Sequence, residues 1–304
     1  MTLEEILATA SQAGSSDIHI EQSQNGISVL HRQHGKLSKM VDLSTSEKLL
    51  NRIKMKANLD LSESRRVQEG QFTFVDQDNT WFVRVSIMAS IRGEKVALRL
   101  LPEKQQLGLN DLNMPAAILE QLKFCLQEPS GLILVCGATG AGKSTTLYAC
   151  LDAINSGKKS IFTIEDPVEY ELAGIFQCEP NPAISLDAIA LLKAFLRQDP
   201  DIIMIGEIRD AQTANLAVSA ALTGHLVFAT LHTNSALDAI HRCHTWQVDF
   251  FSLVSSLQLI IHQSMHYNDS KQHAKFTAIR PRWQEIFPSS YADLIQSSEL
   301  WQAL

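Results

Sequence analysis

Residues 137–144 read Gly-Ala-Thr-Gly-Ala-Gly-Lys-Ser, which is a complete G-x-x-x-x-G-K-[ST] pattern. An apolar run, residues 131–135, precedes it, and a helix-compatible stretch at 145–154 follows. Glycines at this spacing let successive backbone N–H groups turn toward one anionic group, and a helix N-terminus adds partial positive charge. We therefore expect a strand, a phosphate loop and a helix that together bind a nucleoside triphosphate, rather than a chance glycine-rich turn.

The loop contains its own ligands for phosphate and metal. Lys143 can reach the β- and γ-phosphates, and Ser144 can offer its hydroxyl to Mg²⁺. The predicted nucleotide-binding residues are Gly137, Ala138, Thr139, Gly140, Ala141, Gly142, Lys143, Ser144 and Thr145. ATP and Mg²⁺ are accordingly the expected cofactors.

Composition limits the other function classes. The 304 residues predict two domains, and a net charge of −7 argues against a protein that coats nucleic acid, so no nucleic-acid partner is expected. The N-terminus is acidic where a signal peptide would be basic, and no apolar run approaches the roughly 18 residues of a membrane span. The five cysteines never form a C-x-x-C pair, so we expect a cytoplasmic protein with reduced thiols and no structural zinc.

The chain divides into two parts with different patterns. Residues 1–101 have short alternating runs, a helical spacing at 44–59 and a predicted hairpin turn across 23–26, which indicate a small α+β domain. Residues 102–115, with a proline at each end, resemble a linker. The second domain is then expected to span residues 116–304.

Helices and buried-type strands alternate from residue 116 onward. The predicted strands are 131–135, 160–164, 202–205 and 226–229, which implies a mostly parallel sheet with helices on both faces. The region after about residue 243 has a mixed pattern. There His262 and His266 are expected one turn apart on a polar helix, and a zinc site built from them with His241, Cys243 and His244 is disfavoured because no finger spacing is present.

Polar residues follow three of these strands at their carboxyl ends, where ligands bind in such sheets. Glu165 follows the second predicted strand, Glu207 follows four apolar residues as in a Walker-B element, and His232 follows the fourth strand. Glu207 is expected to reach the metal or its waters, and His232 the γ-phosphate. His225 faces the opposite end of the fourth strand. Solvated acidic turns and structural histidines remain the alternatives.

These motifs resemble the secretion ATPase superfamily, whose members are type II secretion and type IV pilus motors of the GspE/PilB kind with their competence-pilus and retraction relatives. The resemblance covers residues 15 to about 243. It rests on residues 137–144, 163–170, 196–210 and 223–235, with 16–21 and 93–101 in the first domain.

The resemblance implies a fold, a set of roles and partners. The expected fold is a RecA-like ATPase domain after a PAS-like N-terminal domain, assembled as a homohexamer at the inner membrane through a platform protein and pilus or secretion components. It implies that Glu165 is the catalytic base, that Glu207 supports Mg²⁺ and water, and that His232 senses the γ-phosphate. Arg84 and Arg99 match two arginines that act across the site from the small domain.

The sequence also departs from the family pattern. Lys193 stands where relatives usually carry arginine, residues 261–265 replace an Ala-Gln-Arg-Leu-type segment, and the end of the chain is short and divergent. The four-cysteine zinc element and the extra N-terminal domain of many relatives are not found. The signature of retraction motors is not found either, and this last absence favours assembly or export. We therefore expect a motor ATPase. A nucleotide-binding scaffold with weak or no turnover is the main alternative, and a DNA translocator is a remote one.

Overall fold

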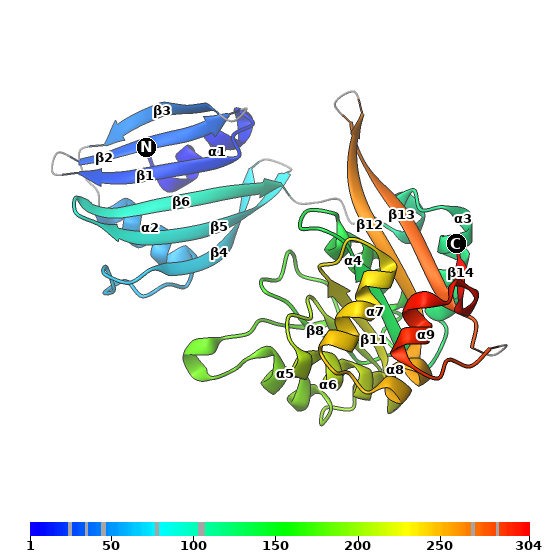
Figure 1. Ribbon diagram of the computed structural model, residues 1–304. Coiled ribbons are helices and arrows are strands. Elements are labelled where there is room, and N and C mark those ends of the chain that lie inside the picture. Colours follow the sequence, from blue (N-terminus) through cyan, green and yellow to red (C-terminus); the bar gives the residue numbers. More distant parts are fainter. Residues whose placement is uncertain are drawn as a thin grey trace. The chain divides into compact units, whose positions relative to one another are not determined.

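The structure, a computed structural model, describes residues 1–23, 26–33, 36–43, 47–76, 79–102, 107–268, 271–283 and 286–304. It contains two compact units, Met1–Gln105 and Gln106–Leu304 (Figure 1). The tip of the predicted turn at 23–26 and residues 103–106 of the predicted linker lie outside the described residues. Residues 109–112 and 114 of that linker region belong to the second unit, where Leu109, Leu112 and Met114 are buried.

The N-terminal unit is one antiparallel sheet with two helices against one of its faces. Its helices are α1 (Leu3–Gln12) and α2 (Glu47–Lys56), and its strands are β1 (Asp17–Ser23), β2 (Gly26–Gln33), β3 (Lys36–Leu43), β4 (Gln68–Asp76), β5 (Asn79–Ser90) and β6 (Gly93–Pro102). The strands run in the order β3-β2-β1-β6-β5-β4. Alternate strand residues pack against the apolar stripes of α1 and α2, so the α+β prediction is confirmed for this unit.

Strand β3 was not predicted, and its sequence explains why. Its first four residues are all exposed, so apolar and polar positions do not alternate along it. It joins the sheet because it pairs with β2 along nearly its whole length, from Ile27 opposite Leu43 to Gln33 opposite Lys36.

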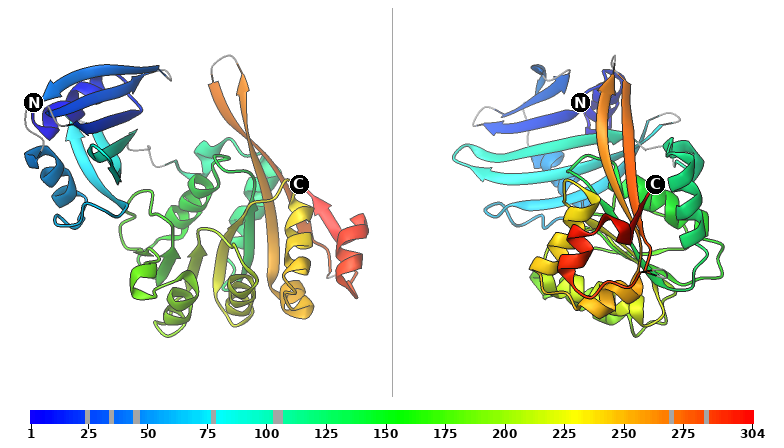
Figure 2. Two further views of the ribbon diagram at one scale, coloured as in Figure 1. Left: turned by 60° about the vertical axis from the view of Figure 1, so that its left-hand side comes forward. Right: turned by 45° about the vertical axis from the view of Figure 1, so that its right-hand side comes forward.

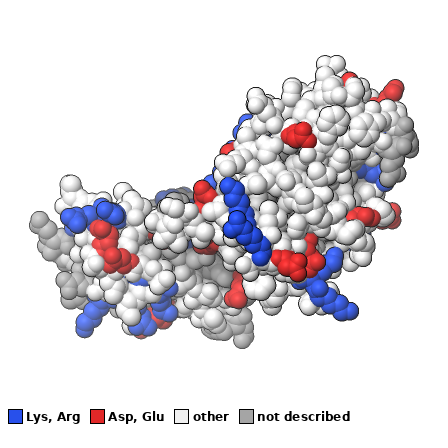
Figure 3. Space-filling model, turned by 90° about the horizontal axis from the view of Figure 1, so that it is seen from below, with Lys and Arg blue, Asp and Glu red and all other residues white. Residues whose placement is uncertain are grey.

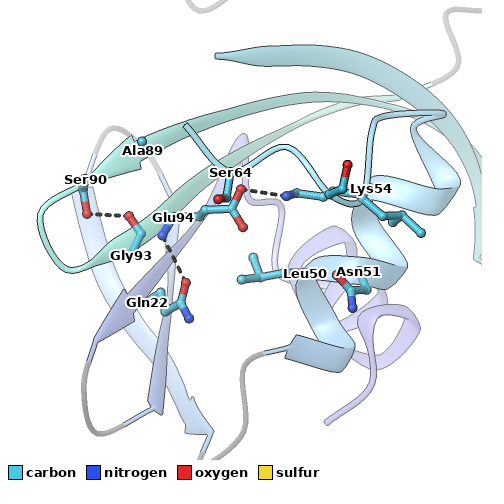
Figure 4. Close-up of a pocket in the computed structure, with 11 residues that line it drawn as sticks. Gln22, Leu50, Asn51, Lys54, Ser64, Ala89, Ser90, Gly93 and Glu94 are labelled. Atoms are coloured by element: carbon cyan, nitrogen blue, oxygen red, sulfur yellow. Dashed lines mark hydrogen bonds and ion pairs between the residues drawn. The ribbon is translucent and has the colours of Figure 1, made fainter. Parts of the chain in front are cut away.

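A buried ion pair ties α2 to β6 inside this unit (Figure 4). The Lys54 ammonium lies 2.8 Å from the Glu94 carboxylate, with side-chain exposures of 2% and 14%, and it also donates to the Glu63 carbonyl at 2.7 Å. The pair borders a polar cavity of about 410 Å³, into which Gln22, Asn51 and Ser90 also project. A buried charge without its partner is costly, so the pair contributes to the position of α2.

The second unit is built on an eight-stranded sheet in the order β14-β13-β12-β7-β11-β10-β8-β9. The strands are β7 (Gly131–Cys136), β8 (Ile161–Ile164), β9 (Phe176–Cys178), β10 (Ile202–Ile205), β11 (Leu226–Leu231), β12 (Leu257–Asn268), β13 (Lys271–Pro281) and β14 (Trp301–Ala303). The run from β12 to β9 is parallel, whereas β13 and β14 are antiparallel to their neighbours.

Helices cover both faces of this sheet (Figure 2). One face carries η1 (Leu109–Leu112), α3 (Ala116–Cys125) and α4 (Lys143–Ile154). The other carries α5 (Ala188–Phe195), α6 (Ala211–Leu222), α7 (Ala236–Thr245), α8 (Phe250–Ser256) and α9 (Tyr291–Gln296); η2 (Pro182–Ile184) and η3 (Ser298–Leu300) are short turns. Every residue of β7, β10 and β11 is therefore buried, as expected for parallel strands between two helical layers.

The helix expected around His262 and His266 is wrong. Both residues lie in β12, which pairs with β7 on one side and with β13 on the other. Ile260 and Ile261 are fully buried on opposite faces of the sheet, as consecutive residues of a buried strand are. The polar residues that follow them made this strand hard to recognise in the sequence. The end of the chain is also structural, because Leu294, Leu300 and Trp301 are part of the core.

We expect Glu94→Gln to lower the unfolding free energy of the N-terminal unit by on the order of 3 kcal/mol, because the buried Lys54 ammonium loses its counter-charge. Hydrogen exchange of β5 and β6 amides in increasing urea measures this. The matched control is Glu21→Gln, whose exposed pair with Lys95 should contribute less than about 1 kcal/mol. Equal losses in the two variants would contradict the assignment.

Candidate nucleotide-binding and active site

The phosphate loop occupies residues 137–142, between the end of β7 and the start of α4. Gly137, Gly140 and Gly142 have φ values of 150°, 78° and 86°, which side chains rarely tolerate. A Cβ on Gly137 would also lie 2.1 Å from the backbone oxygen of Gln263 on β12. Glycine is required at this position both by the conformation and by the lack of space.

Lys143 lies inside this loop. Its side chain is 8% exposed, and the ammonium donates to the carbonyls of Gly137 at 2.9 Å and Ala138 at 3.0 Å. Burial is the main reason that the pKa of Lys143 lies below its ordinary value, while the negative charge of Glu207 acts in the opposite direction. The loop thus surrounds a cation. The exposed Ser144 lies in the first turn of α4, where N–H groups are free to bind an anion.

The carboxyl ends of β10 and β11 bring Glu207 and His232 together. His232 Nε2 lies 3.0 Å from Glu207 Oε1, and Arg209 Nε donates to Glu207 Oε2 at 2.7 Å. Arg209 also reaches Asp166 at 3.1 Å, so it links the end of β10 to that of β8. The hydrogen bond to Glu207 is the main cause of the raised pKa of Arg209. Glu207 is half-buried, with one basic side chain on each of its oxygens.

Glu165 has a different environment, although it also follows a strand of this edge. It is 5% exposed and accepts hydrogen bonds from Tyr148, from Thr163 at 2.6 Å and from Gln177 at 3.0 Å. Burial, reinforced by the Glu165 charge, raises the pKa of Tyr148, so the phenol remains a donor. Both carboxylate oxygens are therefore engaged by the protein.

Arg84 and Arg99 lie in the N-terminal unit. They stand directly opposite each other on β5 and β6 and so share one face of that sheet. Arg99 also pairs with Asp17 at 2.9 Å, and this pair lowers the pKa of Asp17 against the effect of its burial. The two arginines thus form a local cationic pair on one unit.

Two other residues noted in the sequence lie away from this chemistry. His225 contacts the Ala220 carbonyl at 2.8 Å, at the C-terminal end of α6, which is a structural position. Lys193 is exposed in the last turn of α5.

The structure adds residues that the sequence prediction missed. Arg209 stands two positions after Glu207, and this proximity was the available signal. Tyr148 and Gln177 contact Glu165 from 17 and 12 positions away, and no motif links them to it.

The chain is similar to known proteins along most of its length. The model of the family described as "Type II/IV secretion system protein" matches residues 1–290. The chain is 45% identical over 285 residues to "Putative type II secretion system protein E" of Escherichia coli K12, and 42% identical over 263 residues to "Type II secretion system ATPase E" of Vibrio cholerae. These alignments cover 93% and 86% of this chain but 58% and 52% of the relatives, so the chain spans about half of their length.

Solved structures give the same fold. A structure described as the "Pilus Retraction Motor PilT and Bound ADP" has a TM-score of 0.77 and 30% identity, covering 99% of this chain and 87% of its own. The Legionella pneumophila ATPase DotB has a TM-score of 0.72 and 21% identity, covering 98% and 87%. The predicted fold, a RecA-like domain that follows a smaller N-terminal domain in the sequence, is confirmed.

We expect Tyr148→Phe to lower the unfolding free energy of the second unit by about 1–3 kcal/mol, because buried Glu165 loses one of its donors. Urea unfolding monitored by hydrogen exchange in β8 and β10 measures the change. Tyr170→Phe is the matched control, since it keeps the edge-on ring contact with Tyr148 and leaves all donors of Glu165 in place. An equal or larger loss for the control would contradict the role assigned to the Tyr148 hydroxyl, because Tyr170→Phe leaves every donor of Glu165 in place.

Proposed function

The chain belongs to the family of type II/IV secretion system proteins, and on this premise we propose that it is a Mg²⁺-dependent motor ATPase. It hydrolyses ATP to ADP and phosphate to power pilin or pseudopilin assembly, or protein export, in a type IV pilus, competence pilus or type II secretion system. One observation carries this proposal: the phosphate loop, wrapped around the Lys143 ammonium, lies at the same sheet edge as the Glu207–His232 pair. A phosphate cradle and a metal-binding carboxylate then face the same ligand.

The phosphate loop accounts for nucleotide binding. When the triphosphate binds, the Lys143 ammonium exchanges its two carbonyl partners for phosphate oxygens. The negative charge of the phosphates then compensates for the burial that disfavours the charged form of Lys143. The loop N–H groups from Gly137 to Thr145 bind the same oxygens.

The metal would be held by Ser144 and Glu207 together with the nucleotide. No group of three or more His, Cys, Asp or Glu within the described ranges is arranged to hold a metal ion alone. That arrangement suits Mg²⁺, which keeps several waters and takes few protein ligands beside phosphates. A bound Mg²⁺ supplies charge neutralisation at the phosphoryl oxygens. Glu207 would supply a carboxylate oxygen to the metal in place of its hydrogen bond from Arg209.

We assign Glu165 the role of catalytic base and His232 that of γ-phosphate sensor. In the base role, Glu165 would exchange one of its protein donors for the attacking water. Catalytic hydrogen bonds often form only once the substrate is bound. His232 is 40% exposed and bonded to Glu207, so a new contact to phosphate would be transmitted to the metal ligand. Arg84 and Arg99 would supply positive charge to the developing phosphoryl oxygens.

For assembly and partners, we propose a homohexamer bound to an inner-membrane platform protein and to other pilus or secretion components. The protein would be cytoplasmic and peripherally associated with that membrane. The names of the relatives support a secretion role. None of the helices in the described part of the chain has the length and apolar character of a membrane span.

The burial of Glu165 favours one second candidate, a nucleotide-binding scaffold or regulatory paralogue with weak turnover. If its three donors are never released, no carboxylate activates water from this position. Tight ATP binding without phosphate release, in the presence of the platform partner, would support the scaffold function and contradict the motor function.

We expect Lys143→Ala to weaken ATP binding at least about tenfold, because it removes charged hydrogen bonds to phosphate. Equilibrium titration with a fluorescent ATP analogue measures the affinity. The control is Lys193→Ala, which removes an exposed lysine of α5. Normal affinity in the Lys143 variant would overturn the proposed site.

Glu207→Gln and Glu165→Gln are each expected to keep ATP affinity within about threefold while lowering kcat on the order of a hundredfold or more. The first weakens the metal ligand, and the second removes the base. Single-turnover phosphate release separates these effects from product release. If either variant turns over ATP at the normal rate, the role assigned to the substituted glutamate is wrong.

A further inference from the structure

Gln263 of β12 lies against the phosphate loop, although it is more than a hundred residues away in sequence. Its side chain is 2% exposed, and its Oε1 accepts from Thr146 Oγ1 at 2.8 Å. Thr146 is itself fully buried in the first turn of α4, three residues after Lys143. A hydrogen bond between two buried side chains across 117 positions therefore fixes the start of α4 to β12.

The same residue also contacts both ends of the loop. A Cβ on Gly142 would lie 2.8 Å from Gln263 Nε2, and a Cβ on Gly137 would lie 2.1 Å from its backbone oxygen. The loop therefore begins and ends in van der Waals contact with one residue. Strand pairing explains the position: β12 continues past the end of β7, where His262 is opposite Cys136, so Gln263 is beside the loop.

A second glutamine of β12 repeats the contact at the opposite end of β7. Gln258 donates from Nε2 to the Ser130 carbonyl at 2.6 Å, and a Cβ on Gly131 would lie 2.3 Å from that nitrogen. Gln258 is at the amino end of the parallel strands, away from the phosphate loop. The strand thus supplies a natural control, with the same residue type, the same neighbouring strand and a glycine beneath it.

We propose that Gln263 is a positioning residue for the phosphate loop. Its carboxamide fixes the first turn of α4 through Thr146 and fills the space over Gly142, so the loop N–H groups and Lys143 keep the spacing that phosphate binding needs. The inference rests on the proposed nucleotide-binding function and adds to it a residue outside every loop and strand-end motif. Because ground-state phosphates and the transition state use the same loop, the contribution is to binding rather than to the chemical step.

The test compares Gln263→Leu, Thr146→Val and the double variant with the unaltered protein. Each is expected to raise the dissociation constants of ATP and ADP alike by about three- to tenfold, with kcat changed less than about twofold. The double variant should lose no more affinity than the larger single loss, because both changes remove one bond. In the absence of nucleotide, amides of residues 137–146 should exchange faster in all three proteins.

Gln258→Leu is the matched control and should leave nucleotide affinity and exchange in residues 137–146 unchanged. The inference is overturned if Gln263→Leu binds both nucleotides normally, or if Gln258→Leu weakens binding equally, which would indicate general loosening of β12. Thr146→Val tests the same bond should the Gln263 variant not fold. Failure of the unaltered protein to bind ATP would instead overturn the proposed function, so the two failures are distinguishable.

Discussion

The chemistry of this chain depends on parallel pairing between strands that are buried on both faces. In β7, β11, β10 and β8 the register is continuous, so their carboxyl ends lie along one edge. Helical layers on both sides remove every residue of β7, β10 and β11 from water, and the charged side chains of this region follow the carboxyl ends of the strands. The strands are buried on both faces, so charged and polar side chains are accommodated where the strands end. This edge therefore brings together Lys143, Glu207, His232 and Glu165.

At that edge, two glutamates of similar sequence context have opposite surroundings. Glu165 is almost fully buried and accepts from three neutral donors, whereas Glu207 is half-buried between a histidine and an arginine. A carboxylate with solvent-exposed basic partners can exchange one of them for a metal at little cost, because its charge remains compensated. A carboxylate in a neutral, buried site needs a larger rearrangement to meet water. The surroundings therefore distinguish these two glutamates more clearly than the sequence does.

Sequence alone predicted what local pattern determines. The glycine loop, the four central strands and the residues directly after them follow from short motifs, and their roles in the site stay predictions until variants are assayed. The prediction failed for β12, because His262, Gln263 and Ser264 interrupt its apolar run and hide a strand between two others. It also missed Tyr148, Arg209 and Gln263. Their significance comes from partners that tertiary folding brings close, and no local rule encodes those contacts.

The C-terminal residues support the phosphate loop through a chain of contacts. Trp301 of β14 packs edge-on against Trp283 at 5.0 Å and donates to the Leu294 carbonyl at 2.8 Å. Strand β14 pairs with β13, β13 pairs with β12 from Ile260 to Asn268, and β12 places Gln263 on the loop. Interiors are close-packed, so a displacement at one end of such a chain cannot be absorbed locally. The phosphate loop is therefore supported by residues 257–304 as well as by its own glycines.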